Sequence, residues 1–117
     1  MNESILREKT YAFALKIVST SNQISAGHKE FILSKQLLRS GTAPGALMRE
    51  AEFAQSRPDF ISKLSIALKE ANECSYWLSL LKDSDIITQE DFVDLDSDIK
   101  EIVRLLVSSI KTLKSKN

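Results

Sequence analysis

Cysteine, proline and glycine are all scarce in this chain of 117 residues, which has one cysteine, two prolines and three glycines. The single thiol, Cys74, cannot form an internal disulfide, so a disulfide-stapled extracellular scaffold is excluded and a reducing cytoplasm is expected. The few glycines and prolines leave little room for the turns that a sheet of short strands requires. The sequence therefore predicts an all-α, cytoplasmic protein.

Net charge and long apolar runs are also missing. Sixteen basic and sixteen acidic side chains cancel to a formal charge of zero, so no global field attracts a polyanion and a nucleic-acid role would need a local basic patch. No segment approaches the roughly 18 apolar residues of a membrane helix, and the charged amino-terminal segment does not resemble a signal peptide. We expect one domain spanning residues 1–117, without membrane contact.

Residues suited to catalysis or metal binding are few. The only histidine, His28, has no partner that would make it a metal ligand and is expected to be exposed or to cap a helix. Residues 83–101 hold eight of the sixteen acids, but they lack the glycine and the closing glutamate of a calcium loop, so a solvated loop is favoured over a metal site. The sequence predicts no enzyme, no cofactor, no metal and no small-molecule substrate.

What the sequence does contain is helical periodicity in four segments. The first helix is expected over residues 4–24, with Gly27 just past its end. The second is expected over residues 28–55, and its core face is read from five residues: Phe31, Leu37, Gly41, Gly45 and Met48. The connections between the helices are short, which predicts an antiparallel up-down-up-down four-helix bundle.

The third and fourth helices have the clearest start signals. Ser56 supplies a capping hydroxyl, followed by Pro58 in the first turn and by Asp59 three residues on. Thr88 precedes Asp91 in the same way. Apolar residues then recur every three or four positions in the third helix, at Phe60, Leu64, Ala67, Ala71, Cys74, Leu78 and Leu81, and in the fourth, at Phe92, Leu95, Ile99, Ile102, Leu106, Ile110 and Leu113. Cys74 lies on such a seam and is expected to be inert packing.

Two glycines and a proline interrupt the second helix. Gly41 and Gly45 are four residues apart and so lie on one face, where the missing β-carbons permit a close helix contact. Each glycine costs about 1 kcal/mol relative to alanine, and Pro44 costs about 3 kcal/mol or a kink, which we expect near Ser40. The segment follows no strand and lacks the lysine of a P-loop. We therefore assign Gly41, Pro44 and Gly45 to helix packing.

Residues 36–81 closely resemble the family of 23S ribosomal RNA intervening-sequence proteins of bacteria. The matching pieces are QLLRSG from Gln36, Glu50-Ala51, Asp59-Phe60, IALKEA from Ile66, and Tyr76-Trp77-Leu78. The resemblance implies a four-helix bundle that assembles into a ring, typically a pentamer, with no known enzymatic activity. A stretch similar to GTSIGAN is usual in the family, whereas this chain has Ala43, Pro44 and Leu47 in place of the serine, isoleucine and asparagine. These replacements toward apolar or rigid residues argue against a polar chemical role and fit a packing role.

A second, more distant resemblance is to the accessory variability proteins of diversity-generating retroelements. That branch is markedly basic and implies nucleic-acid binding by the same bundle, whereas this chain is neutral. The candidate basic surface for RNA or DNA lies in the fourth helix, with Lys63 and Lys69 of the third helix as further members. Its residues are Lys100, Arg104, Lys111, Lys114 and Lys116.

Five residues of the matched region are candidates for inter-helix or subunit contacts: Arg39, Glu50, Asp59, Tyr76 and Trp77. The charges among them are otherwise independent solvated groups, with pairs worth under about 1 kcal/mol. Trp77 is either a buried edge of the core or an aromatic anchor between subunits. The resulting prediction is a non-enzymatic homo-oligomer, a homopentamer by resemblance, that serves as scaffold or interaction module. The alternative is an RNA- or DNA-binding accessory protein.

Overall fold

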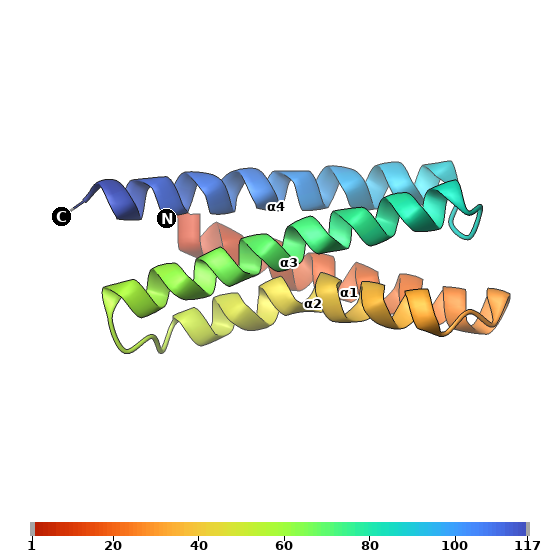
Figure 1. Ribbon diagram of the computed structural model, residues 1–117, viewed down its shortest axis with the longest axis horizontal. Coiled ribbons are helices and arrows are strands. Elements are labelled where there is room, and N and C mark those ends of the chain that lie inside the picture. The colour runs from red at the N-terminus through yellow and green to blue at the C-terminus, as the bar shows by residue number, and fades with distance from the viewer. Residues whose placement is uncertain (1, 117) are drawn as a thin grey trace.

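The computed structural model describes residues 2–116, which form four α-helices and no strand. The helices are α1 (Asn2–His28), α2 (Ile32–Ala51), α3 (Arg57–Asp83) and α4 (Gln89–Ser115). They lie roughly along the long axis of a molecule that measures 49 × 22 × 18 Å (Figure 1). The predicted all-α class and the number of helices are confirmed.

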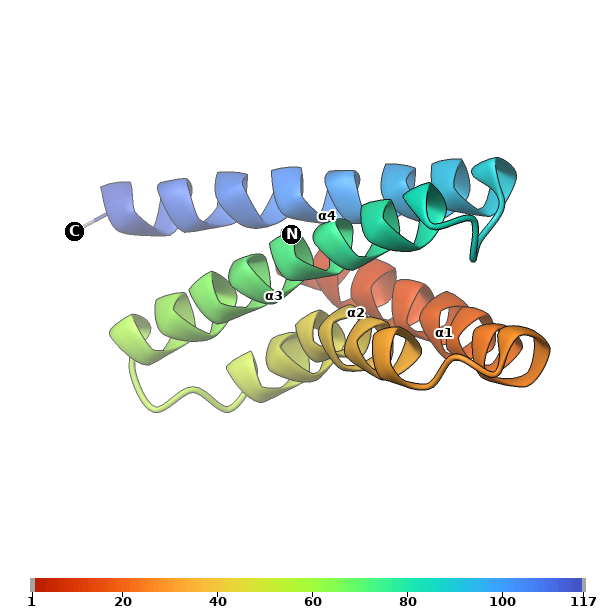
Figure 2. The same ribbon diagram turned by 45° about the vertical axis from the view of Figure 1, so that its right-hand side comes forward.

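Each helix packs on the next one along the chain, and α1 also packs on α4. Among the described residues, no Cα atom of α1 lies within 8 Å of one in α3, and none of α2 lies within 8 Å of one in α4, so these pairs are diagonal. The α1–α2 and α3–α4 connections lie at one end of the molecule, and the α2–α3 connection lies at the other end, as do both termini (Figure 1). After a 45° turn, α3 still lies between α2 and α4 (Figure 2).

The start signals of α3 and α4 are those expected. The Ser56 hydroxyl accepts a hydrogen bond from the Asp59 amide at 3.1 Å, and the Thr88 hydroxyl accepts one from the Asp91 amide at 3.0 Å. Each bond satisfies an amide that has no partner within its helix. At the other end of α4, Arg57 Nη2 donates to the Lys116 carbonyl at 2.8 Å, so the start of α3 also closes the last turn of α4.

The bounds of the first two helices differ from the prediction. Gly27 lies inside α1, which ends at His28, and the left-handed residue is Lys29, with φ of 51°. The second helix begins at Ile32 rather than at His28, because the Glu30 carboxylate accepts from the first amides of α2, at 2.8 Å from Leu33 N. It ends at Ala51 rather than at residue 55. A side chain just outside the helix thus decided where it starts.

The α2–α3 turn also accounts for the early end of α2. The Gln55 amide, which lies outside both helices, donates to the carboxylate of Asp59 in the first turn of α3 at 3.0 Å, and the Phe53 amide donates to the Glu50 carbonyl at 3.0 Å. These bonds replace the helical pattern that residues 52–55 would otherwise continue. Asp59 therefore serves both the cap of α3 and the turn before it.

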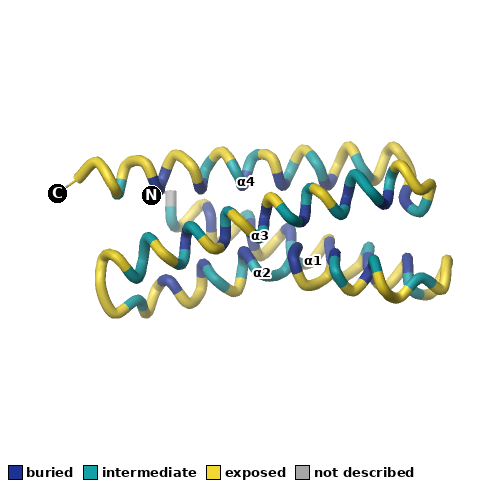
Figure 3. Tube along the Cα trace, in the orientation of Figure 1, coloured by how far each residue is buried: buried dark blue, intermediate teal, exposed yellow. Residues whose placement is uncertain are grey.

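The core lies along the centre of the bundle, where buried segments of the four helices face one another (Figure 3). The predicted seam of α3 is buried from Leu64 to Leu81, including Cys74, while Phe60 is only partly buried. Phe31, predicted on the core face of the second helix, precedes α2 and is 61% exposed. In α4 the predicted seam is buried, apart from Phe92 and Leu113 at its two ends, which are half-buried.

The contact between α1 and α4 is reinforced by charge. Lys16 Nζ lies 2.7 Å from Asp98 Oδ2 and 3.2 Å from Asp94 Oδ2. The hydrogen bond to Asp98, with a smaller one to Asp94, raises the pKa of Lys16 above its ordinary value against a smaller opposing effect of burial. All three side chains are substantially exposed, so the network contributes little to stability.

Candidate functional site

The glycines of α2 lie against α1. A β-carbon added at Gly41 would lie 2.7 Å from Ile17 Cγ1 and 2.8 Å from Ile17 Cγ2, and one added at Gly45 would lie 3.3 Å from the Thr10 carbonyl oxygen. Real β-carbons essentially never approach as closely as the first two distances, so α1 occupies the space that side chains at these positions would fill. Helix α2 runs without interruption across the buried Pro44, and the kink expected there stays a prediction.

A charged and aromatic face lies across α2 and α3. Arg39 Nη1 donates to Glu70 Oε1 at 2.9 Å and Arg39 Nη2 donates to Glu73, which in turn accepts from Trp77 Nε1 at 3.0 Å. The Arg39 side chain thus holds two successive turns of α3, and Trp77 is tied to the same carboxylate. The arrangement fixes the position of α2 along α3, at under about 1 kcal/mol per exposed pair.

The other acidic candidates share one lysine. Lys63 Nζ lies 3.9 Å from Glu50 Oε1 and 3.7 Å from Asp59 Oδ1. Arg39 and Glu50 therefore each reach α3, but through different partners and not through each other. Because Lys63 faces α2, the structure does not bring it to the basic residues of α4.

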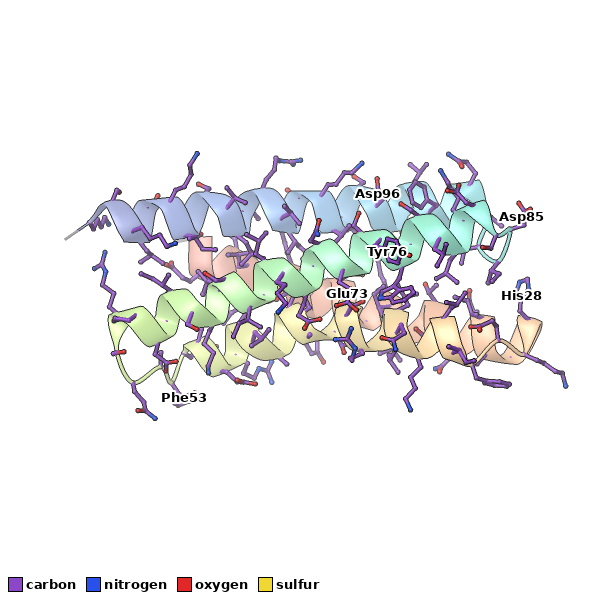
Figure 4. The ribbon with its side chains drawn as sticks, viewed as in Figure 1. His28, Phe53, Glu73, Tyr76, Asp85 and Asp96 are labelled. Atoms are coloured by element: carbon purple, nitrogen blue, oxygen red, sulfur yellow. The ribbon has the colours of Figure 1, made fainter. Side chains whose placement is uncertain are left out.

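Tyr76 and Trp77 point in different directions from α3. Their ring centroids are 5.1 Å apart at an interplanar angle of 69°. Trp77 packs against the core and is partly buried, whereas Tyr76 is exposed. Figure 4 shows Tyr76 and Glu73 on the side of α3 that faces the viewer, away from α1.

The outer side of α1 carries apolar residues that sequence reasoning missed. Tyr11, Leu15 and Val18 are 55%, 57% and 41% exposed, and their spacing of four and three residues places them on one stripe. The signal was present in the sequence, because this spacing repeats the helical period on the side opposite the core residues Phe13 and Ile17. We call these three residues the α1 face.

A groove between α1 and α2 adjoins the α1 face. Its lining residues are Arg7, Tyr11, Ala14, Thr42, Gly45, Ala46 and Arg49. The Arg49 guanidinium carbon lies 5.8 Å from the centre of the Tyr11 ring, close enough for a cation–π contact. Arg7 Nε lies 3.2 Å from Glu52 Oε2, whereas Arg49 has no ion-pair partner within the described chain.

The five basic candidates of α4 and its end are all exposed. Lys100 Nζ lies 2.8 Å from Asp96 Oδ2. Within residues 2–116 no carboxylate lies in ion-pair range of the other four, which are Arg104, Lys111, Lys114 and Lys116. The carboxyl-terminal half of α4 is therefore basic, while its amino-terminal half is acidic.

Cys74 lies in the buried seam of α3, whereas His28 lies at the end of α1. Burial raises the pKa of the Cys74 thiol to about 12, so it is protonated at neutral pH. His28 is exposed at the last residue of α1. The described residues contain no group of three or more potential metal ligands, and none of their helices is both long and apolar enough to cross a membrane.

The chain matches the family described as 23S rRNA-intervening sequence protein over residues 2–108. It belongs to this family. The predicted resemblance is confirmed, and every candidate residue of α2 and α3 lies within the matched range. Lys111, Lys114 and Lys116 lie beyond it, so the most carboxyl-terminal part of the basic surface is outside the family match.

A solved relative of this family has the same fold. A crystal structure of a protein of unknown function from the S23 ribosomal protein family of Bacteroides thetaiotaomicron VPI-5482 superposes with a TM-score of 0.93. The two sequences are 50% identical, and the match covers 95% of this chain and 99% of that chain. No curated protein matches the chain. The 23S rRNA-intervening sequence family thus defines the fold without supplying an activity.

Proposed function

We propose that this 23S rRNA-intervening sequence family protein is a non-enzymatic homo-oligomer that serves as a scaffold or interaction module. Its unit is an antiparallel up-down-up-down bundle, and its assembly is a ring, as the pentamers of the family resemblance imply. The observation that carries the proposal is the α1 face. A helix that is apolar on both its inner and its outer side is normally buried on both, and contiguous apolar surface of this kind marks interaction sites.

The side chains best suited to catalysis are buried or ion-paired, which supports a non-enzymatic role. The Cys74 thiol is buried and has a pKa of about 12, so it supplies neither a thiolate nor access to a substrate. The carboxylates of the α2–α3 face are occupied by Arg39 and Lys63. We place the protein in the cytoplasm, because its single cysteine suits a reducing compartment.

Mass in solution tests self-assembly directly. Sedimentation velocity and native mass spectrometry on the full chain, over a hundredfold range of concentration, are expected to give a discrete species of about five times the 13.1 kDa chain mass. Another discrete multiple would support assembly and correct the subunit number. A species of one chain mass across the whole range would refute the proposal.

RNA or DNA binding is the second candidate, favoured by the four unpaired basic residues at the end of α4. A ring would present this surface once per subunit and raise the apparent affinity through multivalency. Binding through lysine and arginine must weaken steeply with salt. For each phosphate contacted, the logarithm of the binding constant falls by roughly 0.7–0.9 for every tenfold rise in salt concentration. The candidate therefore predicts binding to structured RNA at low salt, with a steep loss as salt rises.

A charge-reversal pair sharpens this second test. Lys111→Glu with Lys114→Glu should abolish binding, whereas Lys29→Glu with Lys35→Glu, also exposed and near the opposite end, should leave it unchanged. Equal loss in both double variants would indicate nonspecific charge attraction. No binding by the wild-type chain at low salt would remove the nucleic-acid candidate.

A further inference from the structure

We propose that the groove between α1 and α2 binds a small organic carboxylate with a short apolar body. The groove has a volume of about 360 Å³, which lies at the lower end of the range of small-ligand sites in proteins. The proposal adds a ligand to the bundle and does not depend on how many copies assemble.

Small residues make the floor of this groove. Ala14 of α1 lines it, together with Gly45 and Ala46 of α2. A β-carbon at Gly45 would lie 3.3 Å from the Thr10 carbonyl oxygen, so the two helix backbones approach closely here. The short side chains leave the space above the backbones unfilled, and a longer side chain at Ala46 would close it.

The two ends of the groove differ in character. Residue numbers rise along α1 and fall along α2 past the groove, as the contacts of the two glycines with α1 show. Arg7 and Arg49 therefore lie toward one end. Ala14 and Thr42 lie toward the other, about 10 Å away at 1.5 Å per residue. The Thr42 hydroxyl already donates to the Leu38 carbonyl at 2.8 Å, so this second end suits an apolar body rather than a second anionic group.

The cationic end has an excess of one positive charge. Arg7 Nε lies 3.2 Å from Glu52 Oε2, whereas Arg49 has no ion-pair partner within residues 2–116. A singly charged ligand balances this excess, and a planar guanidinium donates two parallel hydrogen bonds to a carboxylate. A phosphate monoester, with a charge of about −1.5 to −2 at neutral pH, exceeds the balance. The carboxylate is therefore the anion that fits.

Tyr11 holds Arg49 in place at the groove. The two residues line it from opposite helices, and the guanidinium carbon lies 5.8 Å from the centre of the ring. This cation–π contact keeps the guanidinium beside the groove without a carboxylate. A charged group that is already positioned loses less conformational freedom when a ligand binds. The exposed ring of Tyr11 also provides an apolar wall next to the bound carboxylate.

Binding of hexanoate to the full chain tests the proposal. Saturation-transfer difference NMR detects weak ligands whatever the mass of the assembly. A carboxylate of this size is expected to bind with a dissociation constant of about 1 mM. Hexanamide has the same shape without the charge. It should bind at least about tenfold more weakly, because the charge-assisted hydrogen bonds to Arg49 are lost.

Two matched pairs of variants locate the site. Arg49→Gln should weaken hexanoate binding at least about tenfold, whereas Arg104→Gln, at an exposed arginine of α4, should leave it unchanged. Ala46→Leu fills the groove and should weaken binding by a similar factor. Ala12→Leu makes the same change at an exposed alanine that does not line the groove, so it should have no effect. Circular dichroism spectra of all four variants should retain wild-type helix content.

Several results would overturn the carboxylate site. One is the absence of hexanoate binding to the wild-type chain, and another is equal binding of hexanamide. Equal losses in Arg49→Gln and Arg104→Gln would indicate a general attraction of anions, and tighter binding of hexyl phosphate would show that the ligand class is wrong. Each of these results concerns the groove alone, whereas a failure of self-assembly is measured separately by the mass in solution.

Discussion

A methyl group at Gly41 should destabilise the protein even though alanine is the better helix former. The Gly41→Ala β-carbon would lie 2.7 and 2.8 Å from the two γ-carbons of Ile17, which is fully buried. These atoms are bonded directly to the β-carbon of Ile17, and rotation about χ1 only exchanges one branch for another. Helix α1 must therefore move away from α2.

The size of the effect follows from two opposing terms. Alanine gains about 1 kcal/mol over glycine in helix propensity, whereas overpacking a core costs about 1–3 kcal/mol. We expect Gly41→Ala to lower the free energy of unfolding by about 1 kcal/mol. For Gly45→Ala, where the nearest atom is the Thr10 carbonyl oxygen at 3.3 Å, the two terms should nearly cancel.

Gly27 supplies the control within the same chain. No atom lies within 4 Å of a β-carbon at this position, and Gly27 is helical, so Gly27→Ala should stabilise by up to about 1 kcal/mol. The assay is urea unfolding followed by circular dichroism at one fixed protein concentration, because assembly contributes to apparent stability. The expected order of stability is Gly27→Ala, then Gly45→Ala, then Gly41→Ala.

A double-mutant cycle identifies the contact responsible. In an Ile17→Ala background the two γ-carbons are gone, so Gly41→Ala should become stabilising, with a coupling of about 1–3 kcal/mol between the two sites. If Gly41→Ala stabilises the wild-type background as much as Gly27→Ala does, the close approach of α1 is not the reason for the glycine. A penalty that persists unchanged in the Ile17→Ala background would refute the assignment to Ile17.

Three further predictions concern α3 and its partners. Arg39→Ala should lower the free energy of unfolding by up to about 1 kcal/mol in thermal melts, because the largely covered Glu70 loses its counterion. Burial raises the pKa of Cys74 from its ordinary value of 9.0 to about 12, so the folded chain should resist alkylation at pH 8. Its stability should fall between pH 9 and 12, by at most about 1.4 kcal/mol per pH unit, because the unfolded thiol ionises first. Ser56→Ala should cost about 1 kcal/mol by removing the cap of α3, and the exposed Ser62→Ala should change stability by less than about 0.5 kcal/mol.

Each of these three predictions has a result that contradicts it. For Arg39, it is a melting temperature of Arg39→Ala that is no lower than that of Lys35→Ala, which removes an exposed lysine of α2. For the thiol, it is a Cys74→Ala variant with the same stability curve above pH 9 as the wild type. For the cap, it is equal stability of the Ser56→Ala and Ser62→Ala variants.

The parts of the fold that depend on neighbours in sequence were predictable. The hydroxyls of Ser56 and Thr88 cap their helices three residues on, and the seam from Leu64 to Leu81 is buried as its spacing predicts. Both features depend on residues within one turn of each other. The start of α2 was predicted wrongly although its signal is local, because a cap by Glu30 from before the helix differs from the usual short hydroxyl cap.

The candidate residues show the same division. The sequence singled out Arg39, Glu50 and Asp59, but not that Glu70 and Glu73 would receive Arg39 or that Lys63 would serve the two acids. A charged residue on the surface of one helix can reach several residues of opposite charge on the neighbouring helix. Which of them it pairs with depends on the offset of α2 relative to α3 along the helix axis.

By itself the sequence determined four helices, the caps of α3 and α4 and the residues of their inner faces, because helix formation and amphipathic spacing act between residues three or four positions apart. Only the tertiary structure decided that Gly41 lies on Ile17, which carboxylates hold Arg39, and that Tyr11, Leu15 and Val18 stay exposed on the outer side of α1. These features depend on how closely and at what offset helices distant in sequence pack, and packing is set by the whole core at once.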